Sequence, residues 1–331
     1  MPQHVQKIII LPARKSAPAG GPERASADYT AADRLAAWKA RWGINRMAYR
    51  VNPGLYALGS PGSESPVFAT ANYKLSFDAL RRNLKGVNAW LLVLDTKGIN
   101  VWCAAGKGAF GTLELTRSIR ETGLEELVSR RDIVLPQLGA PGVSAHKVKA
   151  YTGFSVVYGP VRAEDLPEYL RLGGKATPGM RRVRFNFLDR MILAPVQLVY
   201  YGKYFLPVSL LLYFFGFKTD AALTAGALLA GTVLVPALLP WLPGRSFAVK
   251  SAAAGLLVAA LVSYAGGLAL YQFGARALIY AAAASYLGLD FTGASTYTSL
   301  SGVKKEMRLA MPAQALAALA GLLMLLVKRY L

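Results

Sequence analysis

Cysteine is almost absent from this chain: its 331 residues include only one, Cys103. A single cysteine excludes an internal disulfide, and it excludes a zinc site or iron–sulfur cluster held by several cysteines of the same chain. Histidine is nearly as scarce, and His4 and His146 are far apart in sequence, which argues against a histidine-based metal site. A metal centre built from several of these side chains is therefore not expected.

Acidic residues are also few. The chain has 18 Asp and Glu against 38 Lys and Arg, so its formal net charge is +20. Such an excess is typical of proteins that meet nucleic acid or an anionic membrane surface. The basic residues are not interleaved with aromatic ones as in a nucleic-acid groove, so we expect no nucleic-acid partner. The hydrophobic residues, 54% of the chain, concentrate after about residue 191, which favours membrane lipid as the partner.

Long apolar runs dominate the second half of the chain. A bilayer crossing needs about 20 apolar residues, and several runs lack the polar face that a soluble helix needs, although a buried soluble bundle is the alternative. The runs predict an all-α transmembrane bundle of about five helices. Spans two to five contain no Asp or Glu clearly inside them, which argues against an ion-coupled transporter. The predicted spans are residues 191–217, 221–242, 247–270, 277–291 and 309–327.

The Lys and Arg residues beside the spans predict the orientation, because such residues favour the cytoplasmic side. Their excess at the inner ends indicates a cytoplasmic N-terminal domain in a multi-pass protein of the cell membrane. Residues 8–11 form an apolar run too short for a secretory signal. The polar connection at 290–308 would then be cytoplasmic, and we expect it to dock near Cys103. The inner residues are Arg181, Arg182, Arg184, Arg190, Arg245, Lys250, Lys304, Lys305 and Arg308; the outer ones are Lys218, Arg276, Lys328 and Arg329.

The first half of the chain has the pattern of an α/β domain. Residues 1–28 are expected to be mostly disordered, and 30–42 predict a short helix with Thr30 as its N-cap. Turn-rich stretches at 52–54 and 60–63 follow. Strand-length apolar runs then alternate with helix-like segments, which predicts a parallel sheet covered by helices. The predicted strands are 67–71, 89–94, 100–103, 133–135 and 155–158, and the predicted helices are 75–84, 113–120 and 163–172.

Cys103 lies at the end of a predicted strand, where ligands bind in such folds. Lys107 follows four residues later and a helix N-terminus is expected nearby, and both favour a thiolate. A lone cysteine is more often a small buried hydrophobe. A thiolate beside Trp102 would be a nucleophile or a metal ligand, and no His–Asp partner accompanies it. The residues by themselves leave these alternatives open.

Two phosphate-binding patterns overlap the same segment. Residues 106–111 match G-x-G-x-x-G, with Glu125 near the spacing of the acidic residue in a dinucleotide fingerprint. Glu125 falls within a helix-like run and not at a strand end, so the match is weak. A P-loop fails because no glycine lies five residues before Gly106, and Gly108 replaces the Ser or Thr that holds Mg²⁺. A membrane transporter or scaffold with a nucleotide-binding domain is the corresponding alternative function.

Residues 100–107 read Asn-Val-Trp-Cys-Ala-Ala-Gly-Lys. At every position they resemble the cap-helix signature of the membrane-bound corrinoid protein family of microbial mercury methylation. The domain is also similar to the corrinoid domain of the corrinoid iron–sulfur protein of the acetyl-CoA pathway, although this chain lacks that relative's four-cysteine cluster. The Asp-x-His-x-x-Gly motif of histidine-ligated B12 proteins is absent as well. The likeness covers about residues 50–330 and includes 52–56, 70–76, 158–163 and 291–307.

The resemblance implies a domain organisation and a site. Residues 1–44 would be a flexible segment with a short helix, 45–185 a cytoplasmic, Rossmann-like corrinoid-binding domain, and 186–331 the transmembrane domain. The cofactor would be a cobalamin-type corrinoid, with Cys103 as the lower axial ligand of its cobalt and as the catalytic residue. The cap around Cys103 would be formed by Asn100, Val101, Trp102, Ala104, Gly106 and Lys107. Contacts to the corrin amides or nucleotide tail would come from Thr70, Asn72, Ser76, Gly159 and Ala163, for which turn or capping chemistry is the alternative.

The resemblance also implies a reaction. A corrinoid-dependent methyltransferase would pass a methyl group from a methyl-tetrahydrofolate-type donor through cobalt to Hg(II), forming methylmercury. A corrinoid methyl carrier of one-carbon or acetyl-CoA metabolism with another acceptor is the alternative, and residues 100–107 cannot separate the two. Cobalt must be returned to a low-valent state, and this chain has no cysteines for a cluster. Electrons must therefore come from another protein, and the resemblance implies a ferredoxin-like partner with two four-iron clusters.

Overall fold

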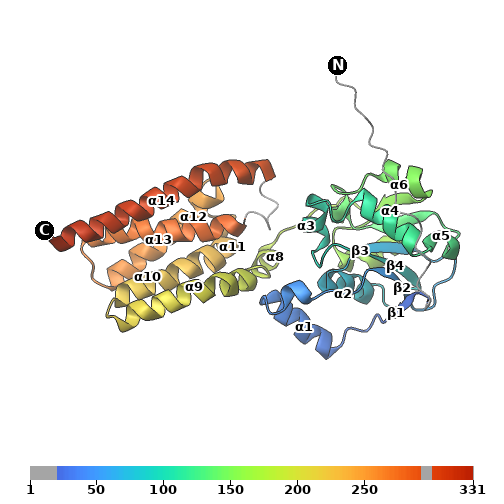
Figure 1. The fold of residues 1–331 in the computed structure, drawn as a ribbon, viewed down its shortest axis with the longest axis horizontal. Coiled ribbons are helices and arrows are strands. Elements are labelled where there is room, and N and C mark those ends of the chain that lie inside the picture. The colour runs from blue at the N-terminus through green and yellow to red at the C-terminus, as the bar shows by residue number, and fades with distance from the viewer. Residues whose placement is uncertain (1–20, 292–299, 331) are drawn as a thin grey trace, which may run out of the picture. The chain divides into compact units, whose positions relative to one another are not determined.

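The computed structural model describes residues 21–291 and 300–330. They form two compact units, which are traced in Figure 1. The first, here called the α/β unit, comprises the residues up to Ala40 and Asn45–Val183. The second, here called the helical unit, comprises Arg41–Ile44 and Arg184–Leu331. In this division residues 21–40 fall in the α/β unit, and the main segment of the helical unit starts at Arg184.

Six strands of the α/β unit form one sheet in the order β1-β2-β4-β3-β5-β6. β3 pairs in parallel with β4 and β5, and β5 pairs in parallel with β6. β2 runs antiparallel to β4, so the sheet is mixed. The predicted parallel pairing is found among β3, β4, β5 and β6. The strands are β1 (Glu23–Ala25), β2 (Gly54–Leu58), β3 (Val67–Ala71), β4 (Ala89–Leu94), β5 (Asp132–Leu135) and β6 (Ser155–Tyr158).

Three local predictions are wrong. Residues 100–103 do not form a strand: helix α3 (Val101–Gly106) begins here, because the Asn100 side chain caps it by accepting a hydrogen bond from Cys103 N at 2.9 Å. β1 lies within the stretch predicted to be disordered, and β2 begins in the turn-rich stretch at 52–54. β1 and β2 lie at the side of the sheet, where pairing with a neighbour sets the conformation of short segments.

Helices cover both faces of the sheet. Alternate residues of β3 point to opposite faces and pack in two different hydrophobic cores. Val67 and Ala69 pack with Leu115 of α4, whereas Phe68 packs with Phe77 of α2. Full burial of such a side chain stabilises the fold by about 1.5–3 kcal/mol. The helices of this unit are α1 (Ala31–Arg41), α2 (Lys74–Asn83), α3, α4 (Thr112–Glu121), α5 (Leu124–Leu127), α6 (Ala145–Thr152) and α7 (Leu166–Arg171), with 3-10 turns at Arg46–Ala48, Gln137–Gly139 and Ala163–Asp165.

Helix α1 is tied to α2 through Asp33. Thr30 caps α1 as predicted, since its Oγ1 accepts from Asp33 N at 3.1 Å. The Asp33 carboxylate accepts from Lys74 Nζ at 3.0 Å and pairs with Arg81 at 2.9 Å. Burial by itself would raise the pKa of Asp33, but the hydrogen bonds from Lys74, Thr30 and Arg81 outweigh burial and hold that pKa well below its usual value. The carboxylate form therefore stabilises the docked helix.

Asp33→Asn should loosen α1 by about 1–3 kcal/mol at neutral pH, the range for hydrogen bonds to charged groups. Since folding lowers this pKa, the stabilisation is complete above the unfolded pKa of about 4 and disappears as the pH falls through and below it. Hydrogen exchange of the α1 amides in the full chain should therefore differ between variant and wild type at pH 7 and converge in acid. Asp28→Asn is the control, because the Asp28–Lys85 pair is exposed. An undiminished difference in acid would contradict the assignment.

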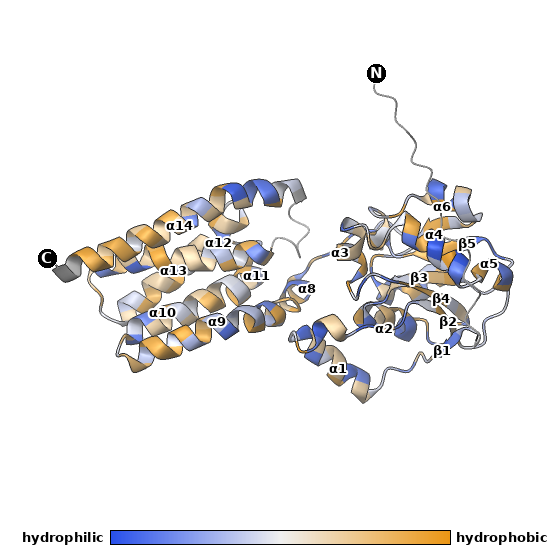
Figure 2. Cartoon of the chain, viewed as in Figure 1, coloured by the Kyte–Doolittle hydropathy of each residue, from blue (hydrophilic) through white to orange (hydrophobic). Residues whose placement is uncertain are grey.

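The helical unit consists of long apolar helices, coloured orange over much of their length in Figure 2. Within the described residues, three stretches are long and apolar enough to cross a membrane: Lys218–Leu238, Phe247–Ala265 and Ser301–Val327. Length and composition thus support three of the five predicted spans. The helices are α8 (Phe187–Met191), α9 (Ala194–Phe214), α10 (Lys218–Leu229), the π-helical turn Ala230–Leu234, α11 (Val235–Leu238), α12 (Phe247–Ala265), α13 (Leu270–Asp290) and α14 (Leu300–Tyr330).

Several boundaries in this unit differ from the prediction. The fourth run begins at Leu270 and not at 277, and α14 already includes residues 300–308, which were predicted as loop. Residues 292–299 of that loop lie outside the described residues. The second span begins at Lys218 and so includes Asp220, whose carboxylate pairs with Arg276 of α13 at 2.8 Å. The negative charge of Asp220 inside this span is thus balanced by Arg276, a pairing that the sequence pattern did not predict.

Candidate functional site

A pocket lies where the strand order of the sheet reverses. The chain passes from β3 to β4 on one side and later adds β5 on the other side of β3, so the carboxyl ends of β3 and β5 form a topological switch point. Ligands of open α/β sheets bind at this place. The pocket has a volume of about 300 Å³, and Thr70 of β3, Pro136 after β5 and Gly159 after β6 contribute to its lining.

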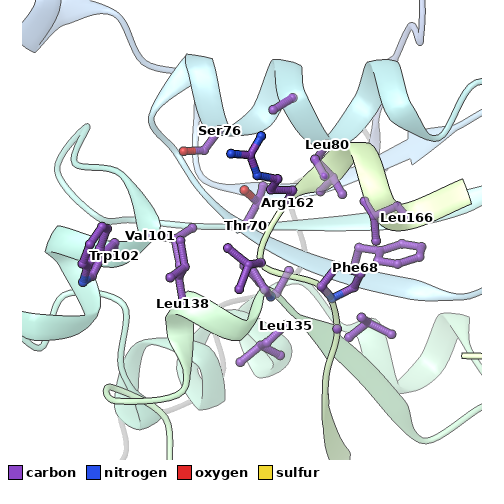
Figure 3. A pocket seen from close by; sticks show the side chains of 18 of the residues that line it. Phe68, Thr70, Ser76, Leu80, Val101, Trp102, Leu135, Leu138, Arg162 and Leu166 are labelled. Atoms are coloured by element: carbon purple, nitrogen blue, oxygen red, sulfur yellow. The ribbon is translucent and has the colours of Figure 1, made fainter. Parts of the chain in front are cut away.

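The lining of the pocket is mostly apolar, with one polar group of side chains (Figure 3). Phe68, Leu135 and Leu166 contribute apolar surface. In Figure 3, Arg162 and Ser76 lie close together above Thr70. A cation beside hydroxyl groups can bind an anionic or strongly polar group of a ligand by hydrogen bonds. The apolar walls can pack against a flat, uncharged ring of the ligand.

Helix α3 forms one wall of this pocket. Its N-cap Asn100 and its residues Val101 and Trp102 line the pocket, while Cys103 is exposed. Successive residues of a helix point about 100° apart, so the thiol leaves the helix in a different direction from the indole of Trp102. The possibility that Cys103 is merely a buried hydrophobe is wrong, because its thiol is accessible to a ligand.

The opposite face of α3 is held firmly against the domain. Ala104 and Ala105 are buried, and Phe110 N donates to Ala104 O at 3.1 Å. A Cβ added at Gly142 would come within 3.0 Å of the Ala105 Cα, so the backbone of the loop before α6 approaches α3 as closely as glycine allows. The capping bond from Cys103 N to Asn100 and this packing together fix where the thiol lies.

The structure brings many of the predicted contact residues to one place. Ala104 is instead buried on the face of α3 that packs against the rest of the unit. Gly106 and Lys107 are exposed at the C-terminal end of this helix. Residues 106–111 follow a helix and not a strand, so the dinucleotide pattern lacks the strand that its fingerprint requires. The predicted contacts that line the pocket are Thr70, Ser76, Asn100, Val101, Trp102, Gly159 and Ala163.

Asn72 has a different place from the one predicted for it, since it is not among the residues lining the pocket. It is 2% exposed, and its Oδ1 accepts from Thr96 N at 3.1 Å and from Gly98 N at 2.9 Å. Its Nδ2 donates to Asp95 Oδ1 at 3.3 Å. Asn72 therefore holds the loop that leads into α3. It contributes no surface to the pocket.

The sequence reasoning missed Arg162, Leu138 and Leu166, which also line the pocket. Arg162 lies four residues after the end of β6, and a basic residue in the loop beyond a predicted strand end is a signal that would have found it. Leu138 and Leu166 lie at a 3-10 turn and at the start of α7. Their placement depends on how these turns pack, for which no local pattern exists.

Comparison with known proteins supports the relation of the α/β unit to corrinoid proteins. Residues 42–170 match the family described as CO dehydrogenase/acetyl-CoA synthase delta subunit. Over 127 residues, 38% of this chain, the sequence is 36% identical to the acetyl-CoA decarbonylase/synthase complex subunit gamma of Archaeoglobus fulgidus. Over 124 residues, 37% of this chain, it is 28% identical to the corrinoid/iron-sulfur protein large subunit of Moorella thermoacetica.

These similarities are partial. The matched part spans 27% of the length of each of these two relatives. The family match ends at residue 170, before the main segment of the helical unit begins at Arg184. The similarity to the corrinoid iron–sulfur protein inferred from the sequence is thus supported for the α/β unit. The resemblance to the membrane protein of mercury methylation stays a prediction.

Proposed function

We propose that this chain is a membrane-anchored corrinoid methyl carrier, in which the α/β unit holds the corrinoid and Cys103 ligates its cobalt. The observation that carries the proposal is the exposed thiol on α3, the helix that walls the switch-point pocket. The 28% identity over 124 residues to a corrinoid/iron-sulfur protein large subunit supports it. A single thiolate on an accessible helix suits a metal ion whose other ligands are supplied by the cofactor itself.

The residues present fit a corrinoid. A pocket of about 300 Å³ with apolar walls suits the aromatic base of the nucleotide tail. Arg162, with Ser76 and Thr70 nearby, suits the tail's phosphate and amide groups. Once bound, the corrinoid supplies a cobalt centre that accepts a methyl group and passes it on. The part of this chain is to bind the tail, to present the Cys103 sulfur and to exclude competing ligands with Trp102.

The remaining parts of the proposal concern location and partners. We assign the helical unit to the cell membrane, with the α/β unit in the cytoplasm, on the strength of its apolar helices and of the basic residues at their predicted inner ends. The only cysteine is assigned to cobalt, so electrons must come from another protein. A ferredoxin-like protein with two four-iron clusters is the proposed donor, and a methyl-tetrahydrofolate-type compound is the proposed methyl source.

Two acceptors are candidates. The Archaeoglobus fulgidus relative is named as a subunit of an acetyl-CoA decarbonylase/synthase complex, and this favours an acceptor in acetyl-CoA metabolism. Hg(II) is the second candidate, through the resemblance of residues 100–107 to the mercury-methylation family; a thiolate ligand would make the cobalt more electron-rich, which would suit an electrophilic acceptor. Anaerobic assays of the full chain, with a methyl-tetrahydrofolate-type donor and a low-potential reductant, should therefore measure two products in parallel: methylmercury from added Hg(II), and acetyl-CoA from added CO, CoA and an acetyl-CoA synthase. Formation of neither product would contradict both acceptors.

Corrinoid affinity tests the pocket itself. Arg162→Ala should weaken corrinoid binding by about tenfold or more, because it removes a charge-assisted contact. Ser76→Phe should weaken it at least as much, since the ring would occupy the pocket, whereas Ser76→Ala leaves the pocket open. Arg171→Ala is the charge control, because Arg171 is exposed on α7 and does not line the pocket. Corrinoid absorbance of the purified full chain gives the affinity, and wild-type binding in both Arg162→Ala and Ser76→Phe would place the tail elsewhere.

A further inference from the structure

A groove with a volume of about 1110 Å³ lies among α12, α13 and α14 of the helical unit. Its walls are mostly small and aliphatic, as at Ala253, Ala281 and Leu309. Arg245, Lys305 and Glu306 also line it. The groove is thus apolar along much of its lining and charged where α12 and α14 begin. The α/β unit and its pocket contribute no residue to it.

Polar contacts along α14 hold this groove open. Glu306 Oε1 accepts from Ser246 Oγ and from Ala248 N, both at 2.7 Å, which joins α14 to the start of α12. Two turns further along α14, Gln314 Nε2 donates to Ser285 Oγ of α13 at 2.8 Å. Between these contacts the lining side chains are too small to fill the space. The opening is therefore built by the fold.

At its other end α14 lies close against α13. A Cβ added at Gly321 would come within 2.8 Å of Ile279 Cγ1, so glycine permits a close approach of the two helices there. The exposed side of α14 is different, since only 6% of the most apolar stretch of this helix is buried. An exposed apolar surface of this extent is unfavourable in water, and in a bilayer the lipid acyl chains shield it from water.

The charged end of the groove carries an excess of positive charge. Glu306 is engaged by the donors at the start of α12, which leaves Arg245 and Lys305 to face the opening. Lys304 directly precedes Lys305, Arg308 follows three residues after it, and both are exposed. In Figure 2 the start of α14 is blue and the rest of the helix is largely orange. Cations at one end of an apolar groove match the phosphate and the acyl chains of an anionic lipid.

We propose that this groove binds one anionic glycerophospholipid, with its phosphate at Arg245 and Lys305 and its acyl chains between α12, α13 and α14. The proposal rests on the membrane location of the helical unit and is independent of the corrinoid. A partner helix fits less well: at a diameter of about 10 Å, roughly 14 Å of helix would fill this volume, about half of a bilayer crossing. Flexible acyl chains can follow a short groove and continue into the bilayer.

Native mass spectrometry of the full chain released from nanodiscs tests this site. The nanodiscs would hold phosphatidylglycerol or phosphatidylcholine with identical acyl chains. The expected result is one retained phosphatidylglycerol per chain, preferred over phosphatidylcholine by at least about tenfold. Arg245→Gln combined with Lys305→Gln should reduce this preference to less than about twofold. Ala313→Phe, which places a ring in the groove from an exposed position on α14, should reduce retention of both lipids.

The matched control is Lys203→Gln combined with Lys218→Gln, which removes two exposed cations from α9 and α10 outside the groove. This control should keep the wild-type preference. Equal retention of the two lipids by wild type, an unchanged preference in the Arg245/Lys305 variant, or a dimer mass showing a second copy in the groove would each overturn the proposal. Failure to enter nanodiscs would overturn the membrane location as well. Corrinoid binding in solution would be unaffected by either failure, so the two proposals are tested separately.

Discussion

Replacing Cys103 with alanine should leave the fold intact and reduce methyl transfer by more than about 100-fold. The thiol is exposed and the change removes one atom, so the cost to stability should stay within about 0.5 kcal/mol. The loss of transfer is expected because no other cysteine exists to take its place. Losing even an indirect partner of a metal ligand costs about 10–100-fold in affinity or activity, so losing the ligand itself should cost more.

The measurement is anaerobic product formation by the purified full chain, normalised to its corrinoid content. Corrinoid should remain bound through the pocket in Cys103→Ala, although its absorbance spectrum should change because the sulfur ligand is gone. Cys103→His is the informative second variant, since it restores a ligand but a neutral and less electron-donating one. It should recover part of the spectrum and little of the transfer. Wild-type turnover in Cys103→Ala at normal corrinoid content would disprove ligation by Cys103.

Replacing Asn72 with alanine should destabilise the loop before α3 by about 3–4 kcal/mol, although Asn72 does not line the pocket. The substitution removes the acceptor of the Thr96 and Gly98 amides and the donor to Asp95. Each hydrogen bond contributes about 1 kcal/mol, and a buried amide left without an acceptor costs more. Thr96 is fully buried, so water cannot readily replace the lost acceptor.

Hydrogen exchange of the full chain locates this effect. The amides of Thr96 and Gly98 should lose protection from exchange in Asn72→Ala. The amides of α3 should also lose protection, because its N-cap Asn100 lies directly after this loop. Asn83→Ala is the matched control: its side chain makes one hydrogen bond, to Ala79 O at 2.8 Å, within α2. It should change exchange only locally. If Asn72→Ala instead left the loop protected and weakened only corrinoid binding, the original prediction of a direct cofactor contact would be correct.

Local patterns predicted β3, β4, β5 and β6 because each is a short apolar run bounded by turn residues. β3, β4 and β6 have the predicted bounds, and α2 and α4 differ by one residue at each end. The predictions failed where conformation depends on a partner far away in sequence. β1 is only Glu23–Ala25 and exists through its pairing with β2. The segment at 100–103 has a strand-like composition, yet the Asn100 cap and the burial of Ala104 and Ala105 make it helical.

The sequence by itself determined which chemistry is available: one thiol, too few histidines for a metal site, and apolar runs long enough for a bilayer. These depend only on composition and on the spacing of residues along the chain. Only the tertiary structure decided which residues share a site. Thr70, Trp102 and Arg162 come together because the reversal of strand order places their elements at one edge of the sheet. The same packing buries Asn72 and leaves Cys103 exposed, since burial is a property of neighbours that a local pattern does not contain.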